Sequence, residues 1–303
     1  MKKNEKLSAF WQKDATRSVL ASLLSILIGL AAGALLIVIV GACSKDLSGK
    51  SVWEGVRLVI FGLFSTGRDA AGALTFGFNP ASIGNMLFRA TPLILTGLSV
   101  AVAFKTGLFN IGAAGQYCIG VCACLYCALG LGWSWPLCLL AAVICGAFFG
   151  MLVGVLKSYC NVNEVISGIM LNWIALYITN TVLSLVKEPT SPYTYKLQGA
   201  RGKAALLPQL GPVNAFFNKN KYITIAVPIA IIIAVLVWVV LEKTKFGYEL
   251  KATGFNKNAA KYCGMAEKRN AILTLVIAGA LAGLGASFYY QSGIQQWECT
   301  ATS

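Results

Sequence analysis

The chain has 303 residues, of which 57% are hydrophobic and only 12% are charged, and its formal net charge is +14. A soluble domain usually carries about 25% charged residues, so the composition excludes an ordinary soluble fold and predicts a membrane protein. The positive charge does not indicate nucleic-acid binding. The basic residues lie mainly at the ends of apolar runs, where they meet lipid headgroups and set topology.

The N-terminal segment 1–17 is basic, and a charge-free run over 18–44 follows it as the first predicted membrane span. Residues 40–43 (VGAC) are similar to a lipoprotein cleavage site. We disfavour that alternative because the apolar run is far longer than a signal-peptide core of about 7–15 residues. A connecting segment over 45–78 comes next, and its amphipathic part, 52–65, is predicted to lie along the membrane surface.

Later apolar runs, each close to the roughly 20 residues that cross a bilayer, predict six more spans. Pro92 lies near the middle of the second span and predicts a kink, because proline lacks a backbone N–H. The chain is therefore predicted to be an all-α, polytopic transmembrane helix bundle of about seven spans, with a membrane domain over 18–290. The six later spans are residues 83–104, 111–131, 136–156, 165–186, 222–241 and 271–290.

The loops between these spans predict the orientation of the chain. Lys and Arg in short loops favour the cytoplasmic side, which places the N-terminal segment 1–17 and the charged loop 242–270 in the cytoplasm. A polar loop over 187–221 and the short tail 291–303 then lie on the opposite, non-cytoplasmic side.

Gly146, Gly150 and Gly154 are spaced four residues apart within one predicted span. Small residues at this spacing form a groove on one helix face and let two backbones approach closely. The alternative is that glycine is simply frequent in membrane helices.

Several kinds of chemistry are not indicated. The chain contains no His, which excludes Ser-His-Asp triads and HExxH zinc sites. The four cysteines within residues 118–127 do not have the paired spacing of zinc sites, so we favour a packing role and predict no metal or cofactor. Arg89 and Glu164 are ionisable but lie near span ends, which is not typical of a proton relay.

Two segments carry most of the functional information: residues 105–116 (KTGLFNIGAAGQ) and residues 161–173 (NVNEVISGIMLNW). The first combines glycines and amides where a helix would break, and unwound backbone at membrane depth is tolerated where it lines a cavity or is covered by protein. Both segments strongly resemble the permease family of ATP-binding cassette importers for branched-chain amino acids, ribose and nucleosides. The likeness is closest to the nucleoside branch and covers residues 81–290.

A third segment, residues 254–265 (GFNKNAAKYCGM), looks like the coupling loop of that family, in which a short cytoplasmic helix docks on the ATPase. Asn256 or Asn258 can cap such a helix, and Gly264 can end it. A solvated basic loop is the alternative. The residues assigned to coupling are Gly254, Asn256, Ala259, Ala260 and Gly264.

The resemblance implies a translocating permease subunit in a bacterial-type plasma membrane that is not itself an enzyme. The implied partners are a cytoplasmic ATPase, a second permease subunit, identical or related, and an extracytoplasmic substrate-binding lipoprotein. Nucleosides are the expected substrates, with sugars or branched-chain amino acids as alternatives. An ion-coupled carrier and a lipid-modifying enzyme are weaker alternatives. Related permeases continue with further spans, so we expect the chain to be truncated at its C-terminus.

Four polar side chains are candidates for the translocation pathway or its gate. Amides and a carboxylate could hydrogen-bond a sugar or a base in an otherwise apolar tunnel. Buried amides also often serve only to tie helices together, and this alternative has equal weight. The candidates are Asn110, Gln116, Glu164 and Asn172.

Overall fold

The computed structural model of the chain describes residues 14–44, 48–69, 72–186, 194–197, 202–218 and 220–298. Six of its helices are long and apolar enough to cross a membrane, and α5 (Ala113–Leu129) is a shorter apolar helix. These helices correspond to the seven predicted spans, so the all-α, polytopic fold class is confirmed. Most of the basic N-terminal segment and the end of the C-terminal tail lie outside the described residues.

The described residues divide into two compact units, Met1–Ile83 and Gly84–Ser303. The first unit contains one long helix whose side chains are almost all exposed, as expected of a helix surrounded by lipid. The predicted surface-lying segment 52–65 is a helix only as far as Phe61, and its end continues into a β-hairpin that the sequence did not predict. The elements of this unit are α2 (Asp14–Cys43), α3 (Gly49–Phe61), η1 (Gly62–Phe64), β1 (Ser65–Arg68) and β2 (Leu74–Phe76).

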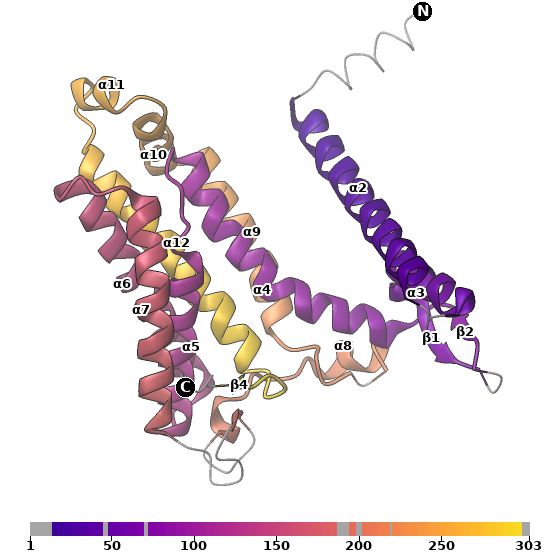
Figure 1. Cartoon of the computed structure of the whole chain (residues 1–303). Coiled ribbons are helices and arrows are strands. Elements are labelled where there is room, and N and C mark those ends of the chain that lie inside the picture. Colours follow the sequence, from indigo (N-terminus) through magenta and orange to yellow (C-terminus); the bar gives the residue numbers. More distant parts are fainter. Residues whose placement is uncertain are drawn as a thin grey trace, which may run out of the picture. The chain divides into compact units, whose positions relative to one another are not determined.

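The second unit holds the other predicted spans and is described with the helix that leads into it, α4. Figure 1 shows α4 bending part-way along its length, in keeping with the proline inside it. The helices are α4 (Pro80–Lys105), α5, α6 (Trp135–Tyr159), α7 (Glu164–Ser184), α8 (Gly211–Phe216), α9 (Ala226–Lys243), α10 (Lys245–Phe255), α11 (Lys257–Tyr262) and α12 (Glu267–Tyr290). Short elements between and after them are β3 (Thr194–Tyr195), η2 (Lys203–Ala205) and β4 (Trp297–Glu298), with β3 and β4 paired antiparallel.

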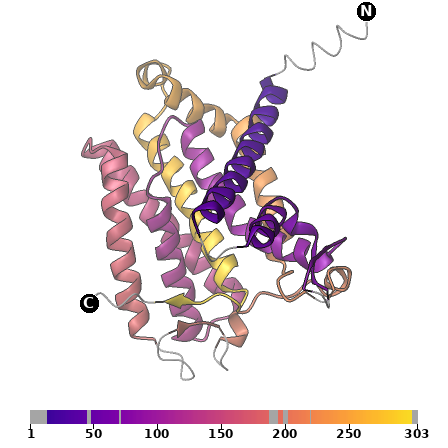
Figure 2. The same cartoon turned by 45° about the vertical axis from the view of Figure 1, so that its right-hand side comes forward.

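Helix α12 forms the centre of the second unit, and it runs through the middle of the bundle in both views (Figure 1, Figure 2). Most of α12 is buried, whereas at most a third of any other candidate span is buried. The glycines of α6 make this packing possible: a Cβ added at Gly150 would collide with the carbonyl oxygen of Leu275, and one at Gly279 with that of Gly146. The predicted small-residue groove is therefore the surface on which α6 meets α12.

The loop 242–270 is more ordered than its charge suggested. Helix α9 ends at Lys243, and after a single extended residue, Thr244, the chain enters α10. The hydroxyl of Thr244 accepts a hydrogen bond from the backbone N–H of Gly247 at 3.1 Å and so caps α10. Leu250 and Thr253 of α10 are buried. The prediction of one short helix in a loop was incomplete, because the narrow buried stripe of α10 is masked in the sequence by its charged residues, Lys245, Glu249 and Lys251.

Candidate functional site

Two of the four candidate pathway residues lie where the connection between α4 and α5 enters α5: Asn110 in the connection and Gln116 in the first turn of α5. The side-chain amides of Asn110 and Gln116 hydrogen-bond each other twice, at 2.9 Å and 3.1 Å, and both residues are buried. Asn110 Nδ2 also donates to Ser99 Oγ of α4 at 3.1 Å. Asn110 therefore links α4, through Ser99, to the start of α5, through Gln116.

Asn172 of α7 forms hydrogen bonds to the same connection and to the start of α5. Its Oδ1 accepts from the backbone N–H of Gly115 at 2.7 Å, and its Nδ2 donates to the carbonyl oxygen of Ile111 at 3.0 Å. The contact requires glycine, since a Cβ at Gly115 would lie 2.7 Å from Asn172 Oδ1 and one at Gly168 would lie 2.9 Å from the backbone nitrogen of Gly112. The two sequence segments therefore meet, and all three amides bond within the protein.

Glu164, the fourth candidate, lies apart from the three amides. It is the first residue of α7 and forms an ion pair with Lys157 of α6 across the turn between the two helices. Asn163 caps α7 by accepting from the backbone N–H of Val165 at 2.8 Å. In this structure Glu164 stabilises the turn between α6 and α7, and a role for it in the pathway remains a prediction.

Helix α11 has both of the end signals that its sequence predicted. Asn256 Oδ1 accepts from the backbone N–H of Ala259 at 3.0 Å and caps the first turn. Gly264 has a φ of +78°, which favours glycine, and its N–H donates to Lys261 O at 3.0 Å. Met265 N–H also donates to Ala260 O, completing a Schellman motif that stops the helix.

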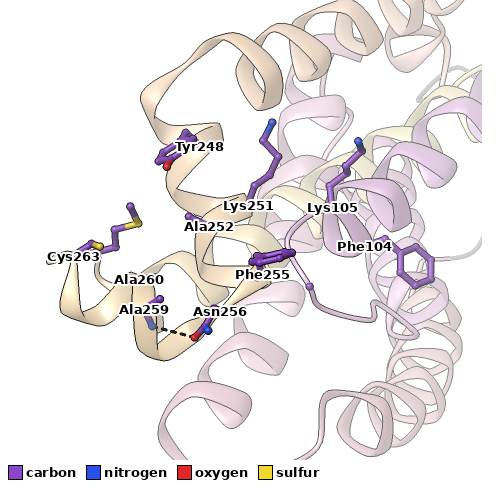
Figure 3. A pocket seen from close by; sticks show the side chains of 13 residues that line it. Phe104, Lys105, Tyr248, Lys251, Ala252, Phe255, Asn256, Ala259, Ala260 and Cys263 are labelled. Carbon is purple, nitrogen blue, oxygen red and sulfur yellow. Dashed lines mark hydrogen bonds between the residues drawn. The ribbon is translucent and has the colours of Figure 1, made fainter. Parts of the chain in front are cut away.

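A groove of about 690 Å³ lies between α11, α10 and the end of α4 (Figure 3). Two aromatic side chains that line it are largely exposed to solvent, Phe255 at 96% and Tyr248 at 64%. Tyr262 of α11, outside the groove lining, is 93% exposed. Lys105 and Lys251 line the groove, and both lie within 4.0 Å of the Glu242 carboxylate, at 3.8 Å and 2.8 Å. Large exposed aromatics on a rigid, capped helix pair are typical of a protein-docking surface.

The groove and the amide cluster are joined by a backbone contact between two glycines. A Cβ at Gly107 would lie 2.6 Å from the carbonyl oxygen of Gly254, and one at Gly254 would collide with the backbone of Thr106. Gly107 also has a φ of +70°. The last turn of α10 therefore rests directly on the loop that leads to Asn110.

Three features of this site were not predicted from the sequence. Nothing in the sequence marks Ser99 as part of the site, because its hydrogen-bond partner, Asn110, lies 11 residues further along the chain. Asn270 ends the charged loop and donates to Thr253 Oγ1 at 2.9 Å, while its Oδ1 is buried without a partner among the described residues. Phe255 and Tyr262 could have been noticed as large aromatics in a loop that is otherwise basic.

Comparison with known proteins places these motifs in a family. The family model described as branched-chain amino acid transport system / permease component matches residues 82–302. The chain belongs to this family. The match covers both motif segments, the α10–α11 pair and α12, so the resemblance read from the sequence is confirmed.

Three relatives give finer comparisons. The guanosine ABC transporter permease protein NupP of Bacillus subtilis (strain 168) is 34% identical over 271 residues, covering 88% of this permease and 70% of NupP. The nucleoside ABC transporter permease protein NupB of Lactococcus lactis subsp. cremoris (strain MG1363) is 33% identical over 295 residues, covering 91% and 71%. The glucose ABC transporter permease protein TsgB13 of Haloferax volcanii is 33% identical over 209 residues, covering 66% and 54%. No solved structure matches this permease.

Proposed function

We propose that this permease forms part of the pathway through which nucleosides are imported across a plasma membrane, driven by ATP hydrolysis on a separate subunit. Family membership supports the permease role, and similarity to NupP and NupB supports nucleosides as substrates. In this proposal the N-terminus and the α10–α11 pair lie in the cytoplasm, as the distribution of Lys and Arg favours. A second permease subunit and a substrate-binding lipoprotein complete the importer.

The α10–α11 pair is the observation that carries the coupling part of the proposal. The cytoplasmic ATPase docks on the exposed Phe255 and Tyr262 and on the adjoining groove. Movement of this surface reaches the α4–α5 connection through the contact between Gly254 and Gly107. That connection is tied to α7 by Asn172, so a push on α11 shifts elements that flank the interior of the bundle.

The residues Asn110, Gln116, Asn172 and Glu164 enter the proposal as parts of a gate rather than as direct ligands. The first three hold the α4–α5 connection, and breaking their hydrogen bonds would let it move. Glu164 and Lys157 hold the turn between α6 and α7. Each of these contacts is polar and therefore able to exchange partners during a transport cycle.

Substrate competition tests the choice of substrate. Cells expressing the complete transporter take up labelled guanosine or uridine in the presence of excess unlabelled nucleosides, glucose or leucine. We expect strong competition by nucleosides and none by glucose or leucine. Competition by glucose would instead favour sugars as the substrates, an alternative that the similarity to TsgB13 supports. Uptake that no nucleoside inhibits would refute nucleoside import.

A further inference from the structure

A second cavity, separate from the groove at α11, lies between three helices of the bundle. Its volume is about 370 Å³, within the range of roughly 300–1,000 Å³ that is typical of small-molecule sites. Its lining is Arg89, Pro92, Leu93 and Thr96 of α4, Tyr117 of α5 and Tyr289 of α12.

Arg89 is the feature of this cavity that demands an explanation. It is exposed and lies in the N-terminal half of a candidate membrane span, nearer its start than its middle; charged side chains within spans are rare and commonly mark a substrate pathway. Within the described part of the chain, Arg89 has no ion pair and no hydrogen bond. Its guanidinium group carries five N–H donors in a planar fork, all free to meet a ligand that enters the cavity.

The two tyrosines are held in place by their neighbours. The ring of Tyr289 stacks on Phe88, with centroids 5.6 Å apart and planes 14° apart, and it meets Tyr290 edge-on at 5.5 Å. Tyr117 directly follows Gln116, whose amide pair fixes the first turn of α5. Aromatic rings that are already ordered bind a flat ligand without losing much conformational entropy.

The combination of groups matches the chemistry of a nucleobase. Base–aromatic stacking occurs on any base because every base has a π-face, and Tyr117 and Tyr289 offer such surfaces. An arginine fork bonds the adjacent O6 and N7 acceptors of guanine, whereas adenine places an amino donor at the same position. Thr96 Oγ1 donates to Pro92 O at 2.8 Å and can still accept a hydrogen bond from the ligand.

We propose that this cavity is the nucleobase-binding site of the translocation pathway, and that Arg89 favours 6-oxopurine nucleosides, such as guanosine and inosine, over adenosine. The inference rests on the proposed function and adds the site and the class of base. It also assigns different roles within one motif: the Asn110–Gln116 pair positions the start of α5, and the next residue, Tyr117, contacts the substrate.

Uptake kinetics of the complete transporter in cells that lack other nucleoside uptake test this proposal. In Arg89→Gln, we expect KM for guanosine to rise about tenfold or more, since a bidentate contact to a base is worth at least that factor, while KM for adenosine changes little. In Tyr289→Leu, uptake of both nucleosides should fall about tenfold. Tyr289→Phe, which keeps the ring, should stay close to wild type.

Tyr177→Leu is the matched control, because Tyr177 also lies in a membrane helix but is 52% exposed and does not line the cavity. Unchanged KM values in both Arg89→Gln and Tyr289→Leu, in a transporter that does import nucleosides, would overturn the site and leave the proposed function standing. Equal losses for guanosine and adenosine in Arg89→Gln would overturn base selection. A wild-type transporter that imports no nucleoside would overturn the proposed function itself.

A second measurement covers variants that fail to assemble. Photolabelling of the wild-type complex with 8-azidoguanosine, followed by peptide mapping, should modify the peptide that contains Tyr117 or Tyr289, and excess inosine should protect it. Modification confined to peptides away from α4, α5 and α12 would overturn the site. Labelling of the cavity that nucleosides do not prevent would show that it takes lipid or another hydrophobic molecule instead.

Discussion

Single glycines determine how closely the helices of this permease can pack. Along α6, Gly146, Gly150 and Gly154 each meet the backbone of α12, so there is no room for even a methyl group on this face. Within a bilayer the hydrophobic effect does not drive helices together, because lipid tails are as apolar as the side chains. Close van der Waals packing between helices takes its place. The small residues therefore specify which face of α6 is buried.

Replacing Gly150 by Ala tests this packing. The new Cβ would collide with the carbonyl oxygen of Leu275, so we expect the free energy of unfolding to fall by about 1–3 kcal/mol. Thermal denaturation of the purified protein in detergent measures the change. Gly29→Ala in α2 is the control, since its Cβ would have nothing within 4 Å, and equal effects of the two replacements would contradict the packing.

The Asn110–Gln116 pair is suited to a double-mutant cycle. Asn110→Leu leaves the buried amide of Gln116 without its partner and should cost about 1–3 kcal/mol of stability, and Gln116→Leu should cost a similar amount. The double replacement should cost less than the sum of the two, with a coupling energy of about 0.5–3 kcal/mol. Strict additivity would show that the two amides do not act as a pair.

Sequence alone could suggest these amides but not their partners. Asn110, Gln116 and Asn172 lie in unusual, polar stretches of apolar chain, which made them candidates. Whether they meet each other or a substrate depends on the approach of α7 to the α4–α5 connection, which is set by contacts 57 and 61 residues apart. Arg89, Tyr117 and Tyr289 lie far apart in the sequence, so no local pattern could have grouped them.

At the level of elements, α10 and α11 form a platform, and the last turn of α10 meets the α4–α5 connection through two glycines. The carbonyl of Gly254 and the backbone of Gly107 are in direct contact, with no side chain between them to absorb movement. A rigid contact of this kind passes a displacement from one element to the next with little loss.

Gly254→Ala should therefore uncouple transport from ATP hydrolysis. The added methyl group would collide with the backbone of Thr106 and displace α10 from the α4–α5 connection, at a cost of about 1–3 kcal/mol. We expect nucleoside uptake to fall while the ATPase still copurifies with the permease. Gly97→Ala in α4, where a Cβ would have nothing within 4 Å, should leave uptake unchanged, and a similar loss in both variants would contradict the coupling contact.

The exposed aromatics of the platform should anchor the ATPase. Phe255→Ser and Tyr262→Ser each remove a large side chain that is more than nine-tenths exposed, so the fold of the permease should be unaffected. Loss of an anchor residue typically costs about 2 kcal/mol or more of binding energy, and recovery of the ATPase in a mild-detergent pull-down should fall accordingly. Phe216→Ser in α8, 64% exposed, is the control. Undiminished recovery in both platform variants would exclude docking at this surface.

The predicted helix boundaries agree with the structure where the apolar runs are long and free of charge. They differ where charged residues mask a helix that has only a few buried side chains. The predicted spans 136–156 and 165–186 match α6 and α7 closely. Helix α5 begins only at Ala113, because Gly107 and the Asn110 contact hold an irregular connection ahead of it. Helix α10 was missed because its lysines suggested a loop, although Leu250 and Thr253 pack inward.

At the largest scale, the second unit combines an apolar bundle, a polar connection between two of its helices and a capped helix pair. The described residues contain no cluster of three His, Cys, Asp or Glu side chains that could hold a metal ion. The exposed aromatics of the helix pair suit the docking of a partner.

The most direct test is transport by the purified, complete importer in proteoliposomes, with the binding protein and labelled guanosine on one side and ATP supplied to the other. We expect accumulation of guanosine that requires ATP, ceases when the ATPase is inactivated, and is unaffected by an ionophore that dissipates ion gradients. Accumulation that persists without ATP and is abolished by the ionophore would contradict it and would make this permease an ion-coupled carrier.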